Sequence, residues 1–136
     1  FKEIPGLDVE LMTYTIQEGR RIPKTKEVVQ VVATLKGKTN RTYLMGGHLD
    51  SYNLQGDPMT AKAPGANDDL SGVVATLEVA RNLVAAKPAE GYQNTLVFVA
   101  FTGEEQGLFG ATALAKRFKS GTASLEGVFN NDTIGS

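Results

Sequence analysis

The stretch from Phe101 to Gly110, Phe-Thr-Gly-Glu-Glu-Gln-Gly-Leu-Phe-Gly, constrains the fold more than any other part of the chain. Its first residue, Phe101, is the last of a continuous apolar run over 96–101, which is typical of a parallel strand covered on both faces. In open α/β sheets ligands bind beyond the carboxyl ends of the strands, so Glu104 and Glu105 stand where a functional site is expected. Because successive residues of an extended segment point in different directions, one acid can hold a metal ion while the other faces a bound water. A charged surface loop is the simpler explanation of two adjacent glutamates, so other residues must decide.

The composition bounds the class of protein. The chain has 136 residues, the size of one domain with a substantial buried core. With 14 basic and 15 acidic residues its net charge is -1, so we expect neither a nucleic-acid nor a membrane partner. The sequence contains no cysteine, so any metal must be held by His, Asp and Glu.

The start of the sequence bears on its location. No apolar run approaches transmembrane length, and no signal peptide is present. The first residue is Phe1 rather than Met, which fits a processed, exported protein or a piece of a longer chain. We expect a secreted protein, extracellular or periplasmic, and we favour a piece of a longer chain.

The pattern along the chain predicts an α/β fold. Residues 9–15 and 27–35 are rich in β-branched residues and predict neighbouring antiparallel strands, and 36–40 predicts a hairpin turn. Further on, strands and helices alternate, which predicts three parallel strands. The predicted strands are 42–45, 96–101 and 125–130, and the predicted helices run from about 67 to 87 and from 108 to 119.

His48 is the only histidine, in the segment Gly46-Gly-His-Leu-Asp50 that follows the third strand. Residues two apart in an extended segment lie on one side, so His48 and Asp50 can face the same space and Asp50 can accept the second N–H of the His48 ring. This arrangement predicts a metal ligand and the residue that orients it, although a lone histidine is more often structural.

Two aspartates open the first helix, after a loop over 51–66 that we expect to border the site. Asp68 or Asp69 could be an ordinary N-cap. A cap accounts for one aspartate and not for both, so the pair also indicates a functional role.

Asp132 follows the predicted strand over 125–130. Together with it, five residues fall at strand ends or at a helix start, and the topology gathers them at one edge of the sheet: His48, Asp68, Glu104, Glu105 and Asp132. Imidazole and carboxylate ligands without thiolate suit zinc, with manganese or cobalt as substitutes. A carboxylate can also bridge two ions in a two-metal hydrolase.

Four ordered stretches carry a resemblance to a known family. They are Gly46-Gly-His-Leu-Asp50, Pro64-Gly-Ala-Asn-Asp-Asp-Leu-Ser-Gly72, Phe101 to Gly110 and Asn131-Asp-Thr-Ile-Gly135. In these the chain closely resembles the co-catalytic zinc aminopeptidases, which include bacterial leucyl aminopeptidases, aminopeptidase Y and glutamate carboxypeptidase II. The resemblance implies a zinc exopeptidase-like fold: three α/β/α layers around a mixed, mostly parallel sheet, truncated at the C-terminus.

The resemblance also implies roles for the residues. His48 and Asp132 would hold one zinc, Asp68 would bridge to a second zinc, and Glu105 would be a ligand of that second ion. Glu104 would be the general base, and Asp50 would orient His48. The peptide bond between Asp68 and Asp69 is typically cis in this family. The substrate implied is a peptide with a free N-terminus, which is hydrolysed by water activated between the metals.

One element of the family pattern is missing. The second zinc also needs a histidine from a downstream segment, and no residue after Asp132 supplies it. Residues 1–136 are therefore expected to be part of a zinc peptidase catalytic domain. The missing C-terminal segment of the same domain is the expected partner. The 136-residue chain alone is expected to be inactive.

Three alternatives share the scaffold. Amidohydrolases that act on N-acyl amino acids usually have Lys-Gly after the bridging aspartate, where this chain has Asp-Leu-Ser-Gly. A glutaminyl cyclase-like transferase uses one zinc and does not need His48. A catalytically inactive binding module would have lost a metal ligand or the base, whereas five of the six residues are retained here.

Overall fold

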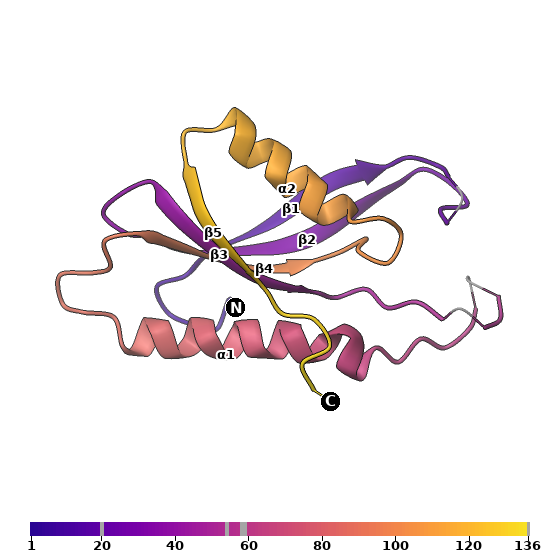
Figure 1. Ribbon diagram of the computed structural model, residues 1–136, viewed down its shortest axis with the longest axis horizontal. Coiled ribbons are helices and arrows are strands. Elements are labelled where there is room, and N and C mark those ends of the chain that lie inside the picture. The colour runs from indigo at the N-terminus through magenta and orange to yellow at the C-terminus, as the bar shows by residue number, and fades with distance from the viewer. Residues whose placement is uncertain (20, 54, 58–59, 136) are drawn as a thin grey trace.

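The computed structural model describes residues 1–19, 21–53, 55–57 and 60–135. The described chain forms a five-stranded sheet and two α-helices (Figure 1). The elements are β1 (Asp8–Ile16), β2 (Lys26–Leu35), β3 (Arg41–His48), α1 (Ser71–Ala85), β4 (Thr95–Phe101), α2 (Phe109–Ser120) and β5 (Ser124–Asn130).

The sheet has the strand order β1-β2-β4-β3-β5. β1 pairs with β2 and β2 with β4 in antiparallel fashion, while β3 lies parallel to both β4 and β5. The predicted mixed sheet, its antiparallel first pair and its three parallel strands are thus confirmed. Among the described strands, parallel pairings equal the antiparallel ones in number and do not exceed them. The carboxyl ends of β3, β4 and β5 meet at one edge, which places the segments that follow them side by side.

The two helices cover opposite faces of the sheet (Figure 1). Alternate residues of β2 and β4 serve the two faces, as the pleat of a strand requires. On the side of α1 the core consists of Ile4, Ala33, Leu35, Ala80 and Phe98, and on the side of α2 of Val32, Leu44, Val97, Val99 and Leu114. The predicted three-layer α/β/α architecture is therefore confirmed.

The prediction of a hairpin turn at 36–40 is wrong. β4 lies between β2 and β3, so this segment leads from one strand to a strand that is not its neighbour. The segment instead runs beside the chain that enters β4, where Lys38 N–H donates to the Tyr92 carbonyl and Thr39 N–H to the Gln93 carbonyl. A short polar turn has the same local signals in both cases, and only the long-range pairing of β4 separates them.

The first helix is shorter than predicted at both ends. A π-helical turn, η1 (Ala66–Leu70), precedes α1, and inside it Asp68 and Asp69 have non-helical backbone angles. The peptide bond between these two aspartates is cis, as the family resemblance implied. Neither aspartate therefore begins the regular helix, and both side chains are free to turn toward the sheet edge.

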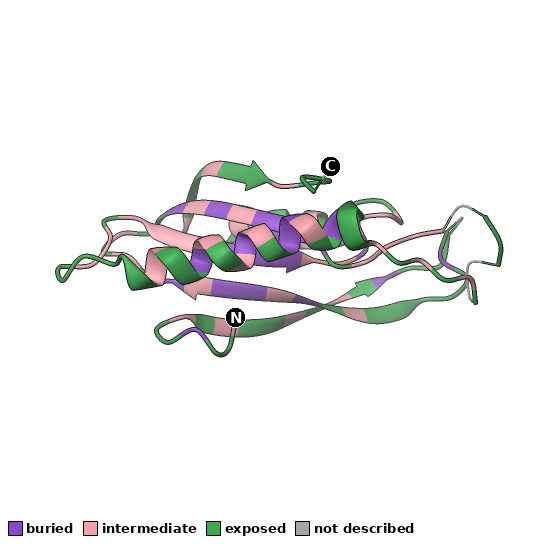
Figure 2. Cartoon of the chain, turned by 90° about the horizontal axis from the view of Figure 1, so that it is seen from below, coloured by how far each residue is buried: buried purple, intermediate pink, exposed green. Residues whose placement is uncertain are grey.

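β5 is an outer strand of the sheet, and most of it faces solvent (Figure 2). Val128 and Phe129 expose 56% and 61% of their surface. The strand therefore adds little to the core, and its main contribution to the site is to carry Asn131 and Asp132 to the end of β3.

Among the residues that the structure describes, every helix falls short of the length and apolar composition that a transmembrane helix requires.

Two glycines allow β3 and the start of α1 to approach closely. A Cβ on Gly47 would lie 2.7 Å from Asp69 Oδ2 and 2.8 Å from the Val73 nitrogen. A Cβ on Gly72 would meet the Asn131 carbonyl oxygen. Because backbone atoms cannot yield as a flexible side chain can, a larger residue at Gly47 would push β3 away from α1, and one at Gly72 would push α1 away from the segment after β5.

Gly47→Ala should therefore destabilise the protein by about 1–3 kcal/mol, the usual cost of forcing a group into a packed interior. Chemical denaturation monitored by circular dichroism would measure the change. Gly19→Ala is the matched control, because a Cβ at Gly19 meets nothing within 4 Å. Equal stabilities of the two variants would show that the close approach is not needed.

Candidate metal centre

His48 is the last residue of β3, and it is 4% exposed. Its ring nitrogen Nδ1 lies 2.8 Å from the backbone carbonyl oxygen of Asp50, while the nearer carboxylate oxygen of Asp50 is 3.9 Å away. The predicted contact between Asp50 and the second ring nitrogen is therefore present, and the acceptor is the carbonyl of Asp50 rather than its carboxylate. The hydrogen bond still fixes the ring and places the proton on Nδ1, so that Nε2 has a lone pair to offer a metal.

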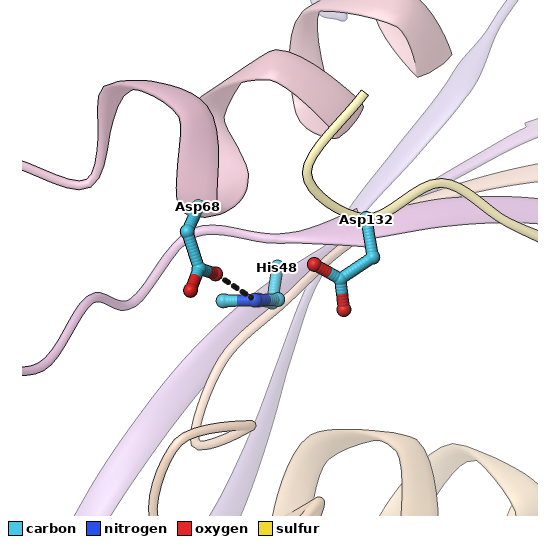
Figure 3. Close-up of side chains that lie close together, drawn as sticks. All are labelled: His48, Asp68 and Asp132. Carbon is cyan, nitrogen blue, oxygen red and sulfur yellow. Dashed lines mark ion pairs between the residues drawn. The ribbon is translucent and has the colours of Figure 1, made fainter. Parts of the chain in front are cut away.

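Two aspartates lie beside this ring (Figure 3). Asp68 comes from η1, and its Oδ1 is 3.1 Å from His48 Nε2. Asp132 follows β5, and one ligand atom from each of these three residues lies within 4.8 Å of the others. The structure thus brings together His48, Asp68 and Asp132, as the sequence predicted. The first and last of these residues are 84 positions apart in the sequence.

The Asp50 carboxylate accepts hydrogen bonds from the segment after β4. Its Oδ1 accepts the backbone N–H of Glu104 at 3.2 Å, and its Oδ2 accepts that of Glu105 at 3.1 Å. The Glu104 carbonyl in turn accepts the N–H groups of Gly107 and Leu108. The backbone of both glutamates is thus anchored, which fixes the directions in which their two side chains can leave it.

The two glutamates occupy different surroundings. Glu104 Oε2 lies 3.8 Å from His48 Nε2, and Glu104 shares a small cavity of about 70 Å³ with His48 and Asp132. Neither glutamate belongs to the cluster of His48, Asp68 and Asp132, and Glu105 has no part in this small cavity. It lines a larger cavity of about 490 Å³ together with Asp68. The divergence predicted for two successive residues is confirmed.

The loop over 51–66 contributes to the larger cavity, as predicted. Ser51, Tyr52, Asn53, Gln55 and the segment 63–66 line it. Leu54, Pro58 and Met59 of the same loop lie outside the described residues. The loop therefore borders the space in front of Asp68 and Glu105.

Carboxylates crowd the site and change its ionisation. Burial lowers the pKa of His48, but the hydrogen bond to Asp50 and the nearby carboxylates outweigh it and hold the pKa above its usual value. Burial raises the pKa of Glu104, and neighbouring carboxylates add to this while His48 opposes it. Burial and the charge of Asp68 also raise the pKa of Glu105. Raised pKa values of two adjacent acids indicate unfavourable negative charge, which a divalent cation would relieve.

Asp69 has a role that the sequence did not reveal. Its carboxylate is buried, with 1% exposed, and it accepts three backbone N–H groups from three segments. Oδ2 accepts from His48 at 3.0 Å, and Oδ1 accepts from Gly72 at 3.0 Å and from Thr133 at 3.1 Å. The sequence signalled only that one N-cap could not account for two aspartates. Asp69 links β3, the start of α1 and the segment after β5, and thereby sets the positions of the residues beside it.

The donor set fits zinc. One imidazole nitrogen and two carboxylate oxygens come from three different elements and converge on a common point. Zinc accepts these ligands, and catalytic zinc sites combine three protein ligands with an open position. The second carboxylate-lined space, between Asp68 and Glu105, adjoins the first through Asp68. Glu104 stands beside the cluster, where it can exchange a proton with a molecule bound there.

Comparisons with known proteins point to one family. The model of peptidase family M28 matches residues 30–136. A protein from Pyricularia oryzae named "Probable zinc metalloprotease" is 41% identical over 132 residues, which cover 96% of this chain and 26% of that protein. A protein from Arthroderma benhamiae named "Probable leucine aminopeptidase" is 40% identical over 107 residues, covering 77% of this chain and 28% of that protein.

The fold matches that of solved structures as well. The crystal structure of a Zn-dependent exopeptidase from Parabacteroides distasonis superposes with a TM-score of 0.74 at 22% identity. The match covers 96% of this chain and 49% of that one. The chain thus spans between a quarter and a third of the length of these two curated relatives, and about half of that solved chain.

Asp69→Asn should lower the stability by about 2–3 kcal/mol, because the amide replaces one accepting oxygen by a donor that faces backbone N–H groups. Thermal or chemical unfolding of the two proteins would measure this. Asp8→Asn, at an exposed aspartate, is the control and should change stability by less than about 0.5 kcal/mol. A loss in Asp69→Asn no larger than in the control would contradict the role of this carboxylate.

Proposed function

The chain belongs to peptidase family M28, and we propose that the protein is a zinc-dependent exopeptidase that removes N-terminal residues from peptides. The observation that carries the proposal is the convergence of His48, Asp68 and Asp132, with Glu104 3.8 Å from the histidine. The names of the relatives from Pyricularia oryzae and Arthroderma benhamiae support a zinc peptidase and, more narrowly, an aminopeptidase.

In this proposal His48 and Asp132 would hold one zinc, and Asp68 would be shared between it and a second zinc, which Glu105 would also hold. The convergence of the first three residues supports the first site. The second site is supported by the cavity that Asp68 shares with Glu105. His48 is the only histidine of the chain, so the further histidine that the family uses at the second zinc would come from outside this sequence.

Bound zinc would supply a Lewis acid that polarises the scissile carbonyl group and lowers the pKa of water. Glu104 would accept a proton from the attacking water and pass it to the nitrogen of the leaving amine. Its raised pKa suits this exchange, because a base must hold the proton briefly and then release it. Asp50 would keep Glu104 in place through the backbone N–H, and it would also orient His48 through its own carbonyl.

The free amino terminus of the substrate would lie in the cavity of about 490 Å³ that Asp68 and Glu105 line. A free amino group in its neutral form has a lone pair to offer a zinc ion held by Asp68 and Glu105, and an acylated nitrogen has not. This is the reason for proposing an aminopeptidase rather than an endopeptidase. The extracellular or periplasmic location stays a prediction.

The experiment that tests the function is an assay of the full-length protein with aminoacyl p-nitroanilides and with the same substrates acetylated at the N-terminus. Release of p-nitroaniline from the free substrates alone is the expected result, abolished by a chelator and restored by zinc. Conversion of N-terminal glutamine to a cyclic product without hydrolysis would favour a glutaminyl cyclase-like transferase. Absence of both activities would favour a binding module.

Glu104→Gln should keep the fold and the zinc content but reduce kcat by about 10²–10⁴, the usual loss on removing a general base. Zinc content would be measured by elemental analysis of the full-length protein and kcat with an aminoacyl p-nitroanilide. Glu105→Gln, the matched control, should instead lower the zinc content. More than a tenth of wild-type kcat in Glu104→Gln would exclude Glu104 as the base.

Asp68→Asn should weaken both zinc ions together, since one carboxylate would serve both. Equilibrium dialysis against zinc would show two stoichiometric sites in the wild type and weaker binding at each in the variant. An N-cap role predicts normal zinc binding and a loss of about 1 kcal/mol in stability. Loss of one site with the other unchanged would reject the bridge.

A further inference from the structure

Arg21 makes a contact with the Glu104–Glu105 segment that the proposed mechanism does not use. Arg21 lies in the connection between β1 and β2, and its Nη1 donates a hydrogen bond to the backbone carbonyl oxygen of Glu105 at 2.7 Å. The guanidinium carbon also lies 6.0 Å from the centre of the Tyr52 ring. At this distance a cation is attracted to an aromatic face. The side chain is therefore held by two partners on the border of the site.

The two peptide groups that flank Glu105 are thus held by side chains of opposite charge. Asp50 accepts the N–H of Glu105, and Arg21 donates to its carbonyl. The neighbouring Glu104 carbonyl is held within its own turn, by Gly107 and Leu108. Both side chains come from distant parts of the chain, since Arg21 lies 84 positions and Asp50 lies 55 positions before Glu105.

We propose that Arg21 is a positioning residue, which fixes the Glu105 peptide so that the Glu105 carboxylate points toward Asp68 and the second zinc. The proposal rests on the assignment of Glu105 as a zinc ligand in the proposed function. Arg21 touches the carbonyl of Glu105, so it acts on the ligand through the backbone. It lies before residues 30–136, the part matched by the family model, and thus outside the segment on which the family assignment depends.

A positioning role and a purely electrostatic role of Arg21 predict opposite changes in zinc affinity when the side chain is removed. The positive charge of Arg21 repels a zinc ion, so if charge alone mattered, removing it would tighten zinc binding. If Arg21 positions Glu105, removing it loosens a ligand and weakens zinc binding instead. Residues that orient metal ligands typically contribute 10–100-fold to metal affinity or activity. Because this hydrogen bond is exposed, we expect the lower end of that range.

Full-length wild-type protein and four variants, one of them Glu105→Gln, would be stripped of metal and titrated with zinc by equilibrium dialysis. Arg21→Gln should raise, by about tenfold, the dissociation constant of the zinc site that Glu105→Gln weakens, and it should leave the other site within about twofold. Arg21→Lys, which keeps the charge and one possible donor, should recover part of the loss. Lys24→Gln removes a charge from the same connection, and it should leave zinc binding unchanged or slightly tighter.

Peptide hydrolysis provides a second readout. The zinc concentration for half-maximal activity should rise about tenfold in Arg21→Gln, while kcat at saturating zinc stays within about threefold of wild type. A uniform loss of kcat at all zinc concentrations, with an unchanged melting temperature and unchanged zinc affinity, would contradict the positioning role. Unchanged or tighter zinc binding in Arg21→Gln, or an equal loss in Lys24→Gln, would overturn the proposal.

Failure of the proposed function gives a different result. A wild-type protein that binds two zinc ions but hydrolyses no peptide would refute the peptidase, and the dialysis would still decide the role of Arg21. A wild-type protein with one zinc site unaffected by Glu105→Gln would refute the role of Glu105, and with it the role of Arg21.

Discussion

The buried carboxylate of Asp69 holds together the three segments that form the site. It accepts backbone N–H groups from His48, Gly72 and Thr133, which belong to the end of β3, the start of α1 and the segment after β5. A buried carboxyl group without such donors would be unfavourable, so these three hydrogen bonds stabilise the arrangement of the three segments. The neighbours of these contacts, Asp68 and Asp132, are thereby brought to His48.

A second carboxylate, that of Asp50, holds the segment that follows β4. Asp50 accepts the N–H groups of Glu104 and Glu105, while its carbonyl accepts the N–H of the His48 ring. One residue thus relates the position of the histidine to that of both glutamates. Movement of the segment after β4 would disturb the imidazole as well, which explains why a site built on strand ends and loops can keep a fixed geometry.

Local patterns predicted most of the elements, because apolar runs, β-branched segments and helical spacing are properties of short stretches. The contacts between stretches were harder to predict. The segment 36–40 has the composition of a hairpin turn, yet β4 lies between β2 and β3. The spacing of His48 and Asp50 correctly placed them together, but it could not show that the acceptor is the carbonyl. Arg21 gave no signal, since its partner is a backbone carbonyl far along the chain.

The sequence by itself determined the chemical types available to the site: one imidazole, several carboxylates and no thiolate, each at the end of a strand or at the start of a helix. It also carried the ordered motifs that mark the family. Only the tertiary structure decided which aspartate faces the histidine and which is buried as a structural link, because Asp68 and Asp69 are adjacent and chemically identical. Their division of roles depends on three N–H donors from separate segments, and those donors come together only when the sheet and α1 have packed.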